Sequence, residues 1–342
     1  MAKEVALELD SPLTPPSRAP AWLKMLRLAR AHPLGVFGLF CILLVTFCAL
    51  FADVIVPYDP EAIAGLGDPD TESPSLDHPF GTDRLGSDVF SRTIFGARIA
   101  MLIGLVAVSL GMVLGSVVGI ASGYFGGFVD SVLQRLVDAL LAFPAIVMLL
   151  AIIAVIGNDD SAVRVFLNDN TPIPEGTWWG IPNFLDIVVV SMAIGIAIAV
   201  GSARVIRGAV LSLKENVYIE AARAMGASDL RIMARHILPN VAALIVVLGT
   251  IFLPLAILAE AAISFLGVGV PAGTPSWGAD MGNLSNRDDA IGRGAWWVVF
   301  FPGFALSLVV LGFNLLGDSF RDISDPRLRG GGGSGSASRT GF

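Results

Sequence analysis

The sequence is poor in charged residues. Asp, Glu, Lys and Arg make up 15% of the 342 residues, whereas hydrophobic residues make up 54% and the mean hydropathy is +0.75. A soluble domain of this length needs more charge to cover its surface. The composition therefore excludes an ordinary soluble protein and indicates a polytopic membrane protein.

Cysteine and histidine are also scarce, and their positions exclude two kinds of site. Cys41 and Cys48 lie seven positions apart in one apolar run, which is about 10 Å of helix and too far for a disulfide. His32, His78 and His236 fall in three separate segments, so no histidine-based metal site is expected.

Lysine is missing from the kind of loop in which ATP binding would require it. The only lysines are Lys3, Lys24 and Lys214, and none of them ends a G-x-x-x-x-G-K-[ST] loop, whose backbone and lysine hold nucleotide phosphates. We therefore expect the chain itself to bind no cofactor.

Long apolar runs are what the sequence has in abundance. About 20 apolar residues cross the roughly 30 Å hydrocarbon core of a bilayer, and a backbone in lipid must pair its polar groups within a helix. We therefore expect an all-α, polytopic membrane protein. Six runs are long enough: about 34–56, 99–122, 137–157, 184–203, 241–265 and 295–317. Trp178, Trp179 and Trp277 lie near span ends and are expected at the membrane interface.

The distribution of Lys and Arg predicts the orientation of these spans. With the N-terminus inside, 16 of the 22 Lys and Arg residues fall in inner segments. The positive-inside rule then favours cytoplasmic N- and C-termini. The expected order is a cytoplasmic segment 1–33, a first transmembrane helix 34–56, an extracytoplasmic segment 57–98, a core 99–320 with five further spans and a cytoplasmic loop at about 204–240, and a cytoplasmic tail 321–342 with a flexible, Gly/Ser-rich end.

Glycines recur every four residues in the second apolar run, at Gly111, Gly115, Gly119 and Gly123. They give one face of a helix no side chains, so a second helix backbone can approach closely. The pattern predicts a close helix contact. It leaves open whether the partner helix belongs to this chain or to another subunit, with this chain slightly favoured.

One carboxylate, Glu260, lies well inside an apolar run, in LPLAILAEAAISFLG. A charge near the centre of a span costs about 2.5–3.5 kcal/mol, so the side chain should face protein or a water-filled cavity. Two interpretations stay open. Glu260 lines a solute path, or it is a helix-end carboxylate that reaches the outer interface.

The stretch NVYIEAARAMGASDLRIMARHILPN, residues 216–240, contains the start and stop signals of two short helices between two spans. Asn216 can cap the first helix, and Gly226 can end it in a left-handed conformation. Ser228 can cap a second helix that runs to about Ile237, and Pro239 then opens the next span.

The loop is too short to bury its own apolar side chains. A groove on a partner protein could cover them, since a helix laid in a groove is a common mode of recognition. The alternative is a loop that rests on its own membrane helices. A DNA-binding helix-turn-helix is excluded by the short tethers to two spans, so no nucleic-acid partner is expected. The side chains in question are Val217, Ile219, Met225, Leu230, Ile232 and Met233.

This loop resembles the EAA loop of the permease subunits of ABC importers, which reads Glu-Ala-Ala, three residues, Gly, nine residues, Ile, one residue, Leu-Pro. The matching residues are Glu220, Ala221, Ala222, Gly226, Leu238 and Pro239. The sequence departs at the Ile position, which is His236, and the neighbouring Ile237 can supply the apolar contact. RHILPN is similar to the form found in the dipeptide/oligopeptide/nickel subfamily.

Other strings resemble the second permease subunit of the same subfamily: HPFGTDRLGSDVFSRTIFGARIA, SFLGVGV, SWGADM and NLLGDSFRDISDPRLR. The resemblance implies the type I ABC importer permease fold with six transmembrane helices, in a bacterial inner membrane. It implies a subunit that forms half of a translocation path for di- or oligopeptides. The implied partners are a second homologous permease, two ATP-binding subunits that carry ATP and Mg, an extracytoplasmic substrate-binding protein and membrane lipid.

Two other functions are weighed against this one. GLGD and YD match the motifs of intramembrane aspartyl proteases, but Asp59 and Asp68 both fall in one polar outer loop, where they would be solvated and ionised. No catalytic residue is therefore assigned. A secondary transporter needs coupling charges near the midplane and often an internal repeat. Only Glu260 is available for such a role.

Overall fold

The computed structural model describes residues 30–61, 71–157, 160–170, 183–271, 273–283, 288, 291–292 and 294–324. These residues form helices and loops with one isolated bridge between Thr82 and Asp88, so the all-α prediction is confirmed. The helices are α2 (Pro33–Leu50), α3 (Ala52–Ile55), α4 (Val89–Phe125), α5 (Gly127–Leu141), α6 (Ala145–Ile156), α7 (Ala162–Asn170), α8 (Phe184–Lys214), α9 (Val217–Ala224), α10 (Asp229–Ile232), the π-helix η1 (Met233–Ile237), α11 (Leu238–Phe265), α12 (Trp277–Gly282) and α14 (Trp297–Ser324).

Within the described residues, five helices are long and apolar enough to cross a membrane, or up to six if the bent pair α5–α6 is one span. The prediction of one unbroken span at 137–157 is wrong, because α5 and α6 meet at an angle of 102°. The break falls at Ala142–Pro144. Pro144 disfavours a helical conformation in the residue before it, so the helix ends there and a new one begins.

Helices α4 and α8 form the centre of the bundle and make the most extensive helix contact in it. The 37 residues of α4 span about 55 Å, which exceeds the hydrocarbon core by roughly 25 Å. Charged residues bracket its apolar part. Arg98 pairs with Asp53 near one end, and Asp130 on α5 pairs with Arg207 beside the other. The stretch between Arg98 and Ser122 carries no charge and is long enough to cross the core.

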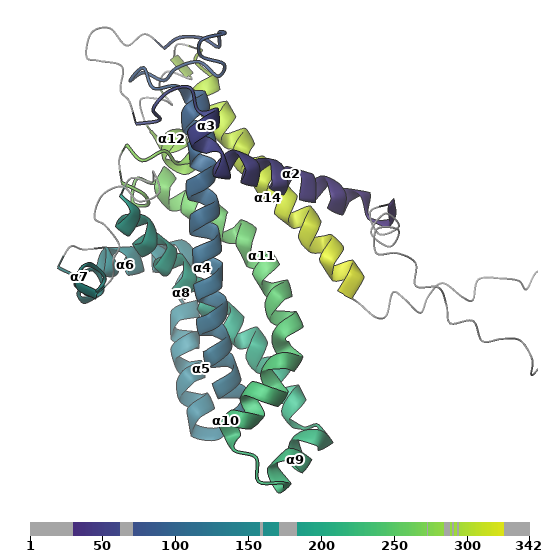
Figure 1. The fold of residues 1–342 in the computed structure, drawn as a ribbon. Coiled ribbons are helices and arrows are strands. Elements are labelled where there is room, and N and C mark those ends of the chain that lie inside the picture. The colour runs from purple at the N-terminus through teal and green to yellow at the C-terminus, as the bar shows by residue number, and fades with distance from the viewer. Residues whose placement is uncertain are drawn as a thin grey trace, which may run out of the picture.

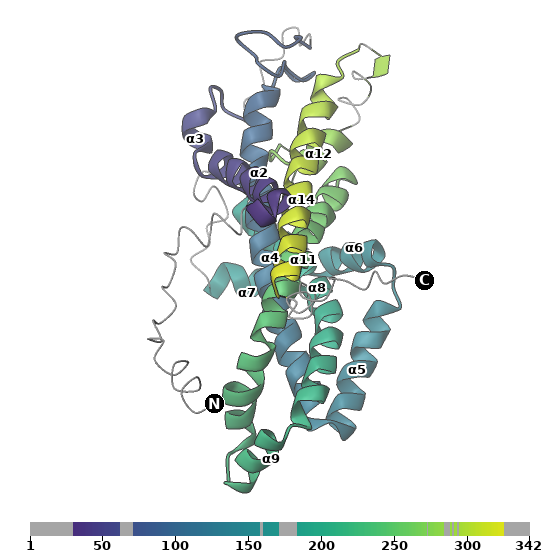
Figure 2. The same cartoon turned by 90° about the vertical axis from the view of Figure 1, so that its right-hand side faces the viewer.

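The polar ends of the bundle lie far apart (Figures 1 and 2). Helix α9 and its turn form one end, and α3, α12 and the loop that precedes α4 lie at the other. Helices α2 and α14 cross each other beside this core, and a Cβ added at Gly38 would lie 2.6 Å from the Gly312 carbonyl oxygen. In Figure 1 both helices end well short of α9, so only α4, α5, α8 and α10–α11 among the labelled helices extend toward that end of the molecule.

Several predictions made from the sequence fall outside the described residues. They concern most of the N-terminal segment 1–33 and of the tail 321–342, together with Asp68, Trp178 and Trp179. The side of the membrane on which each end lies stays a prediction.

Candidate functional site

The elbow, residues 216–237, joins the long helix α8 to the next span. Its two helices begin where the sequence predicts, after Asn216 and Ser228. Neither of these side chains accepts a hydrogen bond from the turn that follows, so the predicted side-chain caps are wrong. The Asn216 amide instead donates back to the Leu213 carbonyl at 2.9 Å. Both residues sit in the extended conformation that precedes a helix, which is what their positions require.

Gly226 ends α9 in the left-handed conformation that the sequence predicts, with φ of 79°. Its N–H donates to the Arg223 carbonyl at 2.9 Å, and the N–H of Ala227 donates to the Ala222 carbonyl at 3.1 Å. These two bonds form a Schellman motif, which satisfies carbonyls that the helix end leaves open. The chain therefore turns sharply and the turn is held by backbone bonds.

The second arm of the elbow continues without a break into the membrane. Pro239 lies in the first turn of α11, as the sequence predicts. Helices α10, η1 and α11 nevertheless follow one another without a gap, so Asp229–Phe265 forms one continuous helical segment of 37 residues. The Leu238 N–H donates to the Met233 carbonyl five residues back, which widens one turn into a π-helix. Pro239 has no N–H, and its ring would press on the Arg235 carbonyl of a regular α-helix. A wider turn removes that conflict.

The elbow has a buried face and an exposed face. Ile219, Ala222, Ile232 and Ile237 are at most 4% exposed and pack against their own chain. For Ile219 and Ile232, the alternative in which the loop rests on its own chain is therefore the one that the structure shows. The exposed face carries Val217, Met225 and Leu230, which are 79%, 82% and 74% exposed.

The residues that match the EAA pattern divide between these two faces. Ala222 lies on the buried face of α9. The other residues of the pattern are exposed: Glu220, Ala221, Gly226, Leu238 and Pro239. A Cβ at Gly226 would meet nothing within 4 Å, so the requirement for glycine there is conformational rather than steric.

A polar cluster fastens the elbow to the end of α4. The Tyr124 hydroxyl donates to Asp229 Oδ1 at 2.6 Å, and the Arg223 guanidinium donates to the same hydroxyl at 3.3 Å. Arg223 also lies over the Tyr124 ring, 5.8 Å from its centroid. Sequence reasoning did not find this cluster, because the three residues lie in three different elements and no local motif joins them.

The glycine stripe of α4 packs against α8 of the same chain. A Cβ at Gly111 would lie 2.8 Å from the Gly195 carbonyl oxygen, and one at Gly119 would lie 2.6 Å from that of Ala203. A Cβ at Gly115 would lie 3.0 Å from the Ala199 carbonyl oxygen, and one at Gly123 would lie 3.0 Å from that of Arg207. The two backbones are therefore in direct contact over about three turns.

At the opposite end of the bundle, Glu260 is 1% exposed and accepts hydrogen bonds from Ser264 and Ser276, each at 2.8 Å. It does not reach an interface with solvent, so that interpretation is wrong. It is also not among the residues that line four cavities of about 300–560 Å³ in the described part of the chain. Its carboxylate instead ties the loop that follows α11 to the end of α11.

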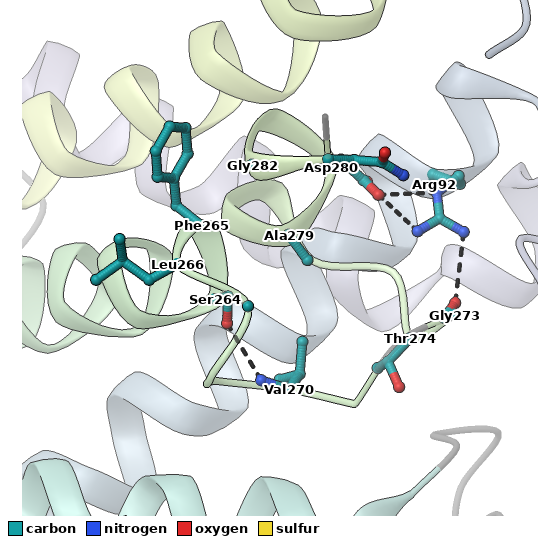
Figure 3. Close-up of a pocket in the computed structure, with 12 residues that line it drawn as sticks. Arg92, Ser264, Phe265, Leu266, Val270, Gly273, Thr274, Ala279, Asp280 and Gly282 are labelled. Carbon is teal, nitrogen blue, oxygen red and sulfur yellow. Dashed lines mark hydrogen bonds and ion pairs between the residues drawn. The ribbon is translucent and has the colours of Figure 1, made fainter. Parts of the chain in front are cut away.

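The same loop carries a buried ion pair (Figure 3). Arg92 at the start of α4 donates to Asp280 Oδ1 through Nε at 3.0 Å and Nη2 at 2.5 Å, and through Nη1 to the Pro60 and Gly273 carbonyls at 2.9 Å and 3.4 Å. Arg92 thus joins three outer segments. It lines a cavity of about 550 Å³ together with Ser264, Thr274 and the backbone that follows α11.

Burial and pairing act on the Asp280 carboxyl in opposite directions. Burial raises its pKa, and the positive charge and hydrogen bonds of Arg92 lower it; burial prevails. Burial likewise raises the pKa of Asp83 in the outer loop, although backbone N–H groups of Ser87 and Leu85 donate to that carboxylate. The outer end is therefore a buried polar network whose charges depend on one another.

Trp277 is a structural residue of this end. It is 1% exposed, its Nε1 donates to the Thr93 carbonyl at 2.8 Å, and its ring sits over Gly96 of α4. The expectation that Trp277 lies at the membrane interface is wrong. Interface tryptophans keep one edge in water, and this one has its only polar atom bonded inside the protein.

Of the two aspartates that would serve a protease, the structure describes one. Asp59 lies in the outer loop with its carboxylate bonded to the Glu61 N–H at 2.9 Å, and Asp68 is outside the described residues. In the described part of the chain, no group of three or more His, Cys, Asp or Glu residues is arranged to hold a metal ion.

Residues 111–330 match the family of binding-protein-dependent transport system inner membrane components. The chain belongs to this family. Residues 21–74 match the N-terminal transmembrane domain of oligopeptide transport permease C. The resemblance that the elbow sequence shows is thereby confirmed, and the matched region contains the elbow, the loop that follows α11 and all four glycines of the stripe.

Relatives of this transport family member cover almost the whole chain. A permease of Brucella suis biovar 1, named for a peptide transport system, is 37% identical over 312 residues, which are 91% of this chain and 94% of that protein. The glutathione transport system permease protein GsiD of Pectobacterium atrosepticum is 39% identical over 303 residues, 89% and 90% of the two chains. An inward-facing structure of the MetNI methionine ABC transporter covers 69% of this chain and 98% of its own at 22% identity, with a TM-score of 0.48.

Proposed function

We propose that this inner membrane component is a permease subunit of an ATP-driven importer and forms half of a path for di- or oligopeptides. Two relatives that span nearly the whole chain are named for peptide and glutathione transport, and glutathione is itself a small peptide. The selection of one peptide over another is assigned to a separate substrate-binding protein outside the membrane.

The observation that carries the proposal is the elbow. Val217, Met225 and Leu230 are exposed on the surface of the elbow. Because α4 is longer than the hydrocarbon core is thick, the elbow at its end lies beyond the bilayer. Apolar side chains that are more than 70% exposed on a rigid element indicate a protein-binding surface rather than a solvent-facing one. We assign this surface to an ATP-binding subunit, which holds the ATP and Mg that this chain is not expected to bind.

The elbow is built to transmit displacement rather than to absorb it. One arm is continuous with α11 through 37 residues, and the other joins α8, which is packed backbone to backbone on α4. Movement of an ATP-binding subunit against the elbow would therefore move three spans. The positive-inside rule places this end in the cytoplasm, where ATP is available.

This chain forms only half of the proposed path, so further subunits are needed to complete the importer. A second homologous permease would supply the other half, with its own ATP-binding subunit, and the outer end around α12 would receive the substrate-binding protein. The whole assembly would lie in a bacterial inner membrane, with both termini of this chain in the cytoplasm.

Reconstitution tests the proposal. The chain is co-expressed with its neighbouring permease, ATP-binding subunits and substrate-binding protein, and placed in liposomes with labelled peptide. Uptake should require ATP, Mg and the binding protein together. Uptake that needs only an ion gradient, or that proceeds with this chain alone, would show a secondary transporter instead.

A further inference from the structure

Tyr124 touches both arms of the elbow at once. Arg223, in the last turn of α9, donates to its hydroxyl at 3.3 Å, and the hydroxyl donates to Asp229, the first residue of α10, at 2.6 Å. Gly226 lies between these two residues in the chain, and it is where the chain bends. The phenol therefore spans the bend from the inside.

The positions of these groups favour a strong contact. Tyr124 is 6% exposed, whereas Arg223 and Asp229 are exposed residues that reach in from the surface. A phenol that donates to a carboxylate makes a charge-assisted hydrogen bond, which is stronger than a bond between neutral groups. The guanidinium 5.8 Å above the ring centroid adds a cation–π contact. Any change in the angle between α9 and α10 must stretch or break one of the two hydrogen bonds.

The same residue is joined rigidly to the membrane helices. Tyr124 directly follows Gly123, the last glycine of the stripe, where a Cβ would lie 2.8 Å from Val210 of α8. Its helix ends only one residue later, at Phe125. A displacement of the elbow that reaches the phenol is therefore passed to α4 and α8 together.

We propose that Tyr124 is a positioning residue for transport: it fixes the bend of the elbow and passes the movement of the elbow to the α4–α8 pair. This inference rests on the proposed function, because it requires an elbow that is moved by an ATP-binding subunit. The hydroxyl does not hold the elbow in place by itself. Ile219, Ala222 and Ile232 bury that face whether or not the hydroxyl is present.

Because the apolar residues hold the elbow in place and the Tyr124 hydroxyl transmits its movement, removal of the hydroxyl should impair transport without unfolding the elbow. Tyr124→Phe removes both hydrogen bonds and keeps the ring, its burial and the cation–π contact. The elbow should remain folded and able to bind the ATP-binding subunit, while its movement is transmitted less completely. ATP hydrolysis should continue, and the number of peptide molecules imported per ATP should fall.

The experiment measures peptide uptake and ATP hydrolysis in the same liposomes, using the full complex with its binding protein. We expect Tyr124→Phe to lower uptake per ATP by about tenfold, the factor that one hydrogen bond to a charged group contributes to an equilibrium. Asp229→Ala, at an exposed position, removes the acceptor of the Tyr124 hydroxyl and should lower the ratio as well. The double variant should be no worse than the more impaired single variant, because both changes break one contact. Tyr58→Phe in the outer loop removes a half-exposed hydroxyl far from the elbow and should leave the ratio unchanged.

Each outcome decides the question. A wild-type ratio for Tyr124→Phe overturns the inference while leaving the proposed function intact. Independent, additive effects of the two substitutions overturn it too, because the residues would then act separately. If Tyr124→Phe does not assemble, Asp229→Ala alone decides, and a wild-type ratio for that variant refutes the role. Failure of the wild-type complex to show ATP-dependent uptake would instead contradict the proposed function itself.

Discussion

The packing of α4 on α8 makes a quantitative prediction for Gly119. A Cβ added there would lie 2.6 Å from the Ala203 carbonyl oxygen, about 0.7 Å inside the ~3.3 Å of even a close C–H···O contact. The obstacle is helix backbone, which cannot rotate aside as a side chain would. In Gly119→Ala the two helices must therefore separate.

The cost of that separation is shared along the stripe. A gap of 0.5–1 Å forfeits about a quarter to a half of each dispersion contact. Gly115 and Gly123 lie one turn away on either side, so their contacts with α8 open as well. We expect Gly119→Ala to lower the free energy of unfolding by about 1–3 kcal/mol, the usual cost of overpacking.

Gly208 on α8 is the matched control. A Cβ there would meet nothing within 4 Å, and the residue lies inside the same kind of helix. Gly208→Ala should therefore raise stability by about 0.5–1 kcal/mol through the lower flexibility of alanine. The assay is far-UV circular dichroism of each purified protein as SDS replaces mild detergent in mixed micelles. If Gly119→Ala were as stable as Gly208→Ala, the close backbone contact would be refuted.

Three further predictions concern the elbow and the outer end. Gly226→Val forces a β-branched residue to φ of 79° and should lower the amount of peptide imported per ATP in liposomes. Gly226→Asn tolerates this conformation and should keep most of that uptake. Equal uptake per ATP in the two variants would contradict the role of the turn. Glu260→Gln keeps an oxygen that Ser264 and Ser276 can donate to, so its uptake should match the wild type, and a complete loss would show that the charge itself serves transport. Asp280→Ala leaves the buried Arg92 charge uncompensated and should lower the free energy of unfolding, measured by thermal unfolding, by about 3–5 kcal/mol. A decrease below ~1 kcal/mol would show that the ion pair is exposed to water.

Much of the elbow could be predicted from the sequence because its signals are local. The left-handed turn at Gly226 and the starts of α9 and α10 follow from residue types at adjacent positions. The continuity of α10 with α11 could not, because proline normally marks the start of a helix. Here the π-turn before Pro239 accommodates it inside a longer one.

The outer end could not be predicted, because its contacts join segments far apart in the chain. Arg92 and Asp280 are 188 positions apart, and neither stands out among the charged residues of a polar loop. Glu260 did stand out as a carboxylate in an apolar run. Its partners could not be foreseen, since Ser276 returns to it only through the fold of the loop after α11. The bend between α5 and α6 does not show in the hydropathy of residues 137–157, because the apolar run continues on both sides of Pro144 while the helix does not.

Cross-linking of the elbow in the assembled importer tests the central claim most directly. Met225→Cys, made in a background that lacks Cys41 and Cys48, places a thiol at a position 82% exposed on the elbow, and Phe40→Cys places a control thiol on α2 at a position 60% exposed. Treatment of intact complexes with a short reagent that alkylates the thiol at one end and carries a photoreactive group at the other should, on illumination, join the Met225→Cys chain to the ATP-binding subunit. The yield should change when ATP binds, and the Phe40→Cys chain should remain unjoined to that subunit. Absence of any product between the elbow and the ATP-binding subunit, in complexes that import peptide, would contradict the account.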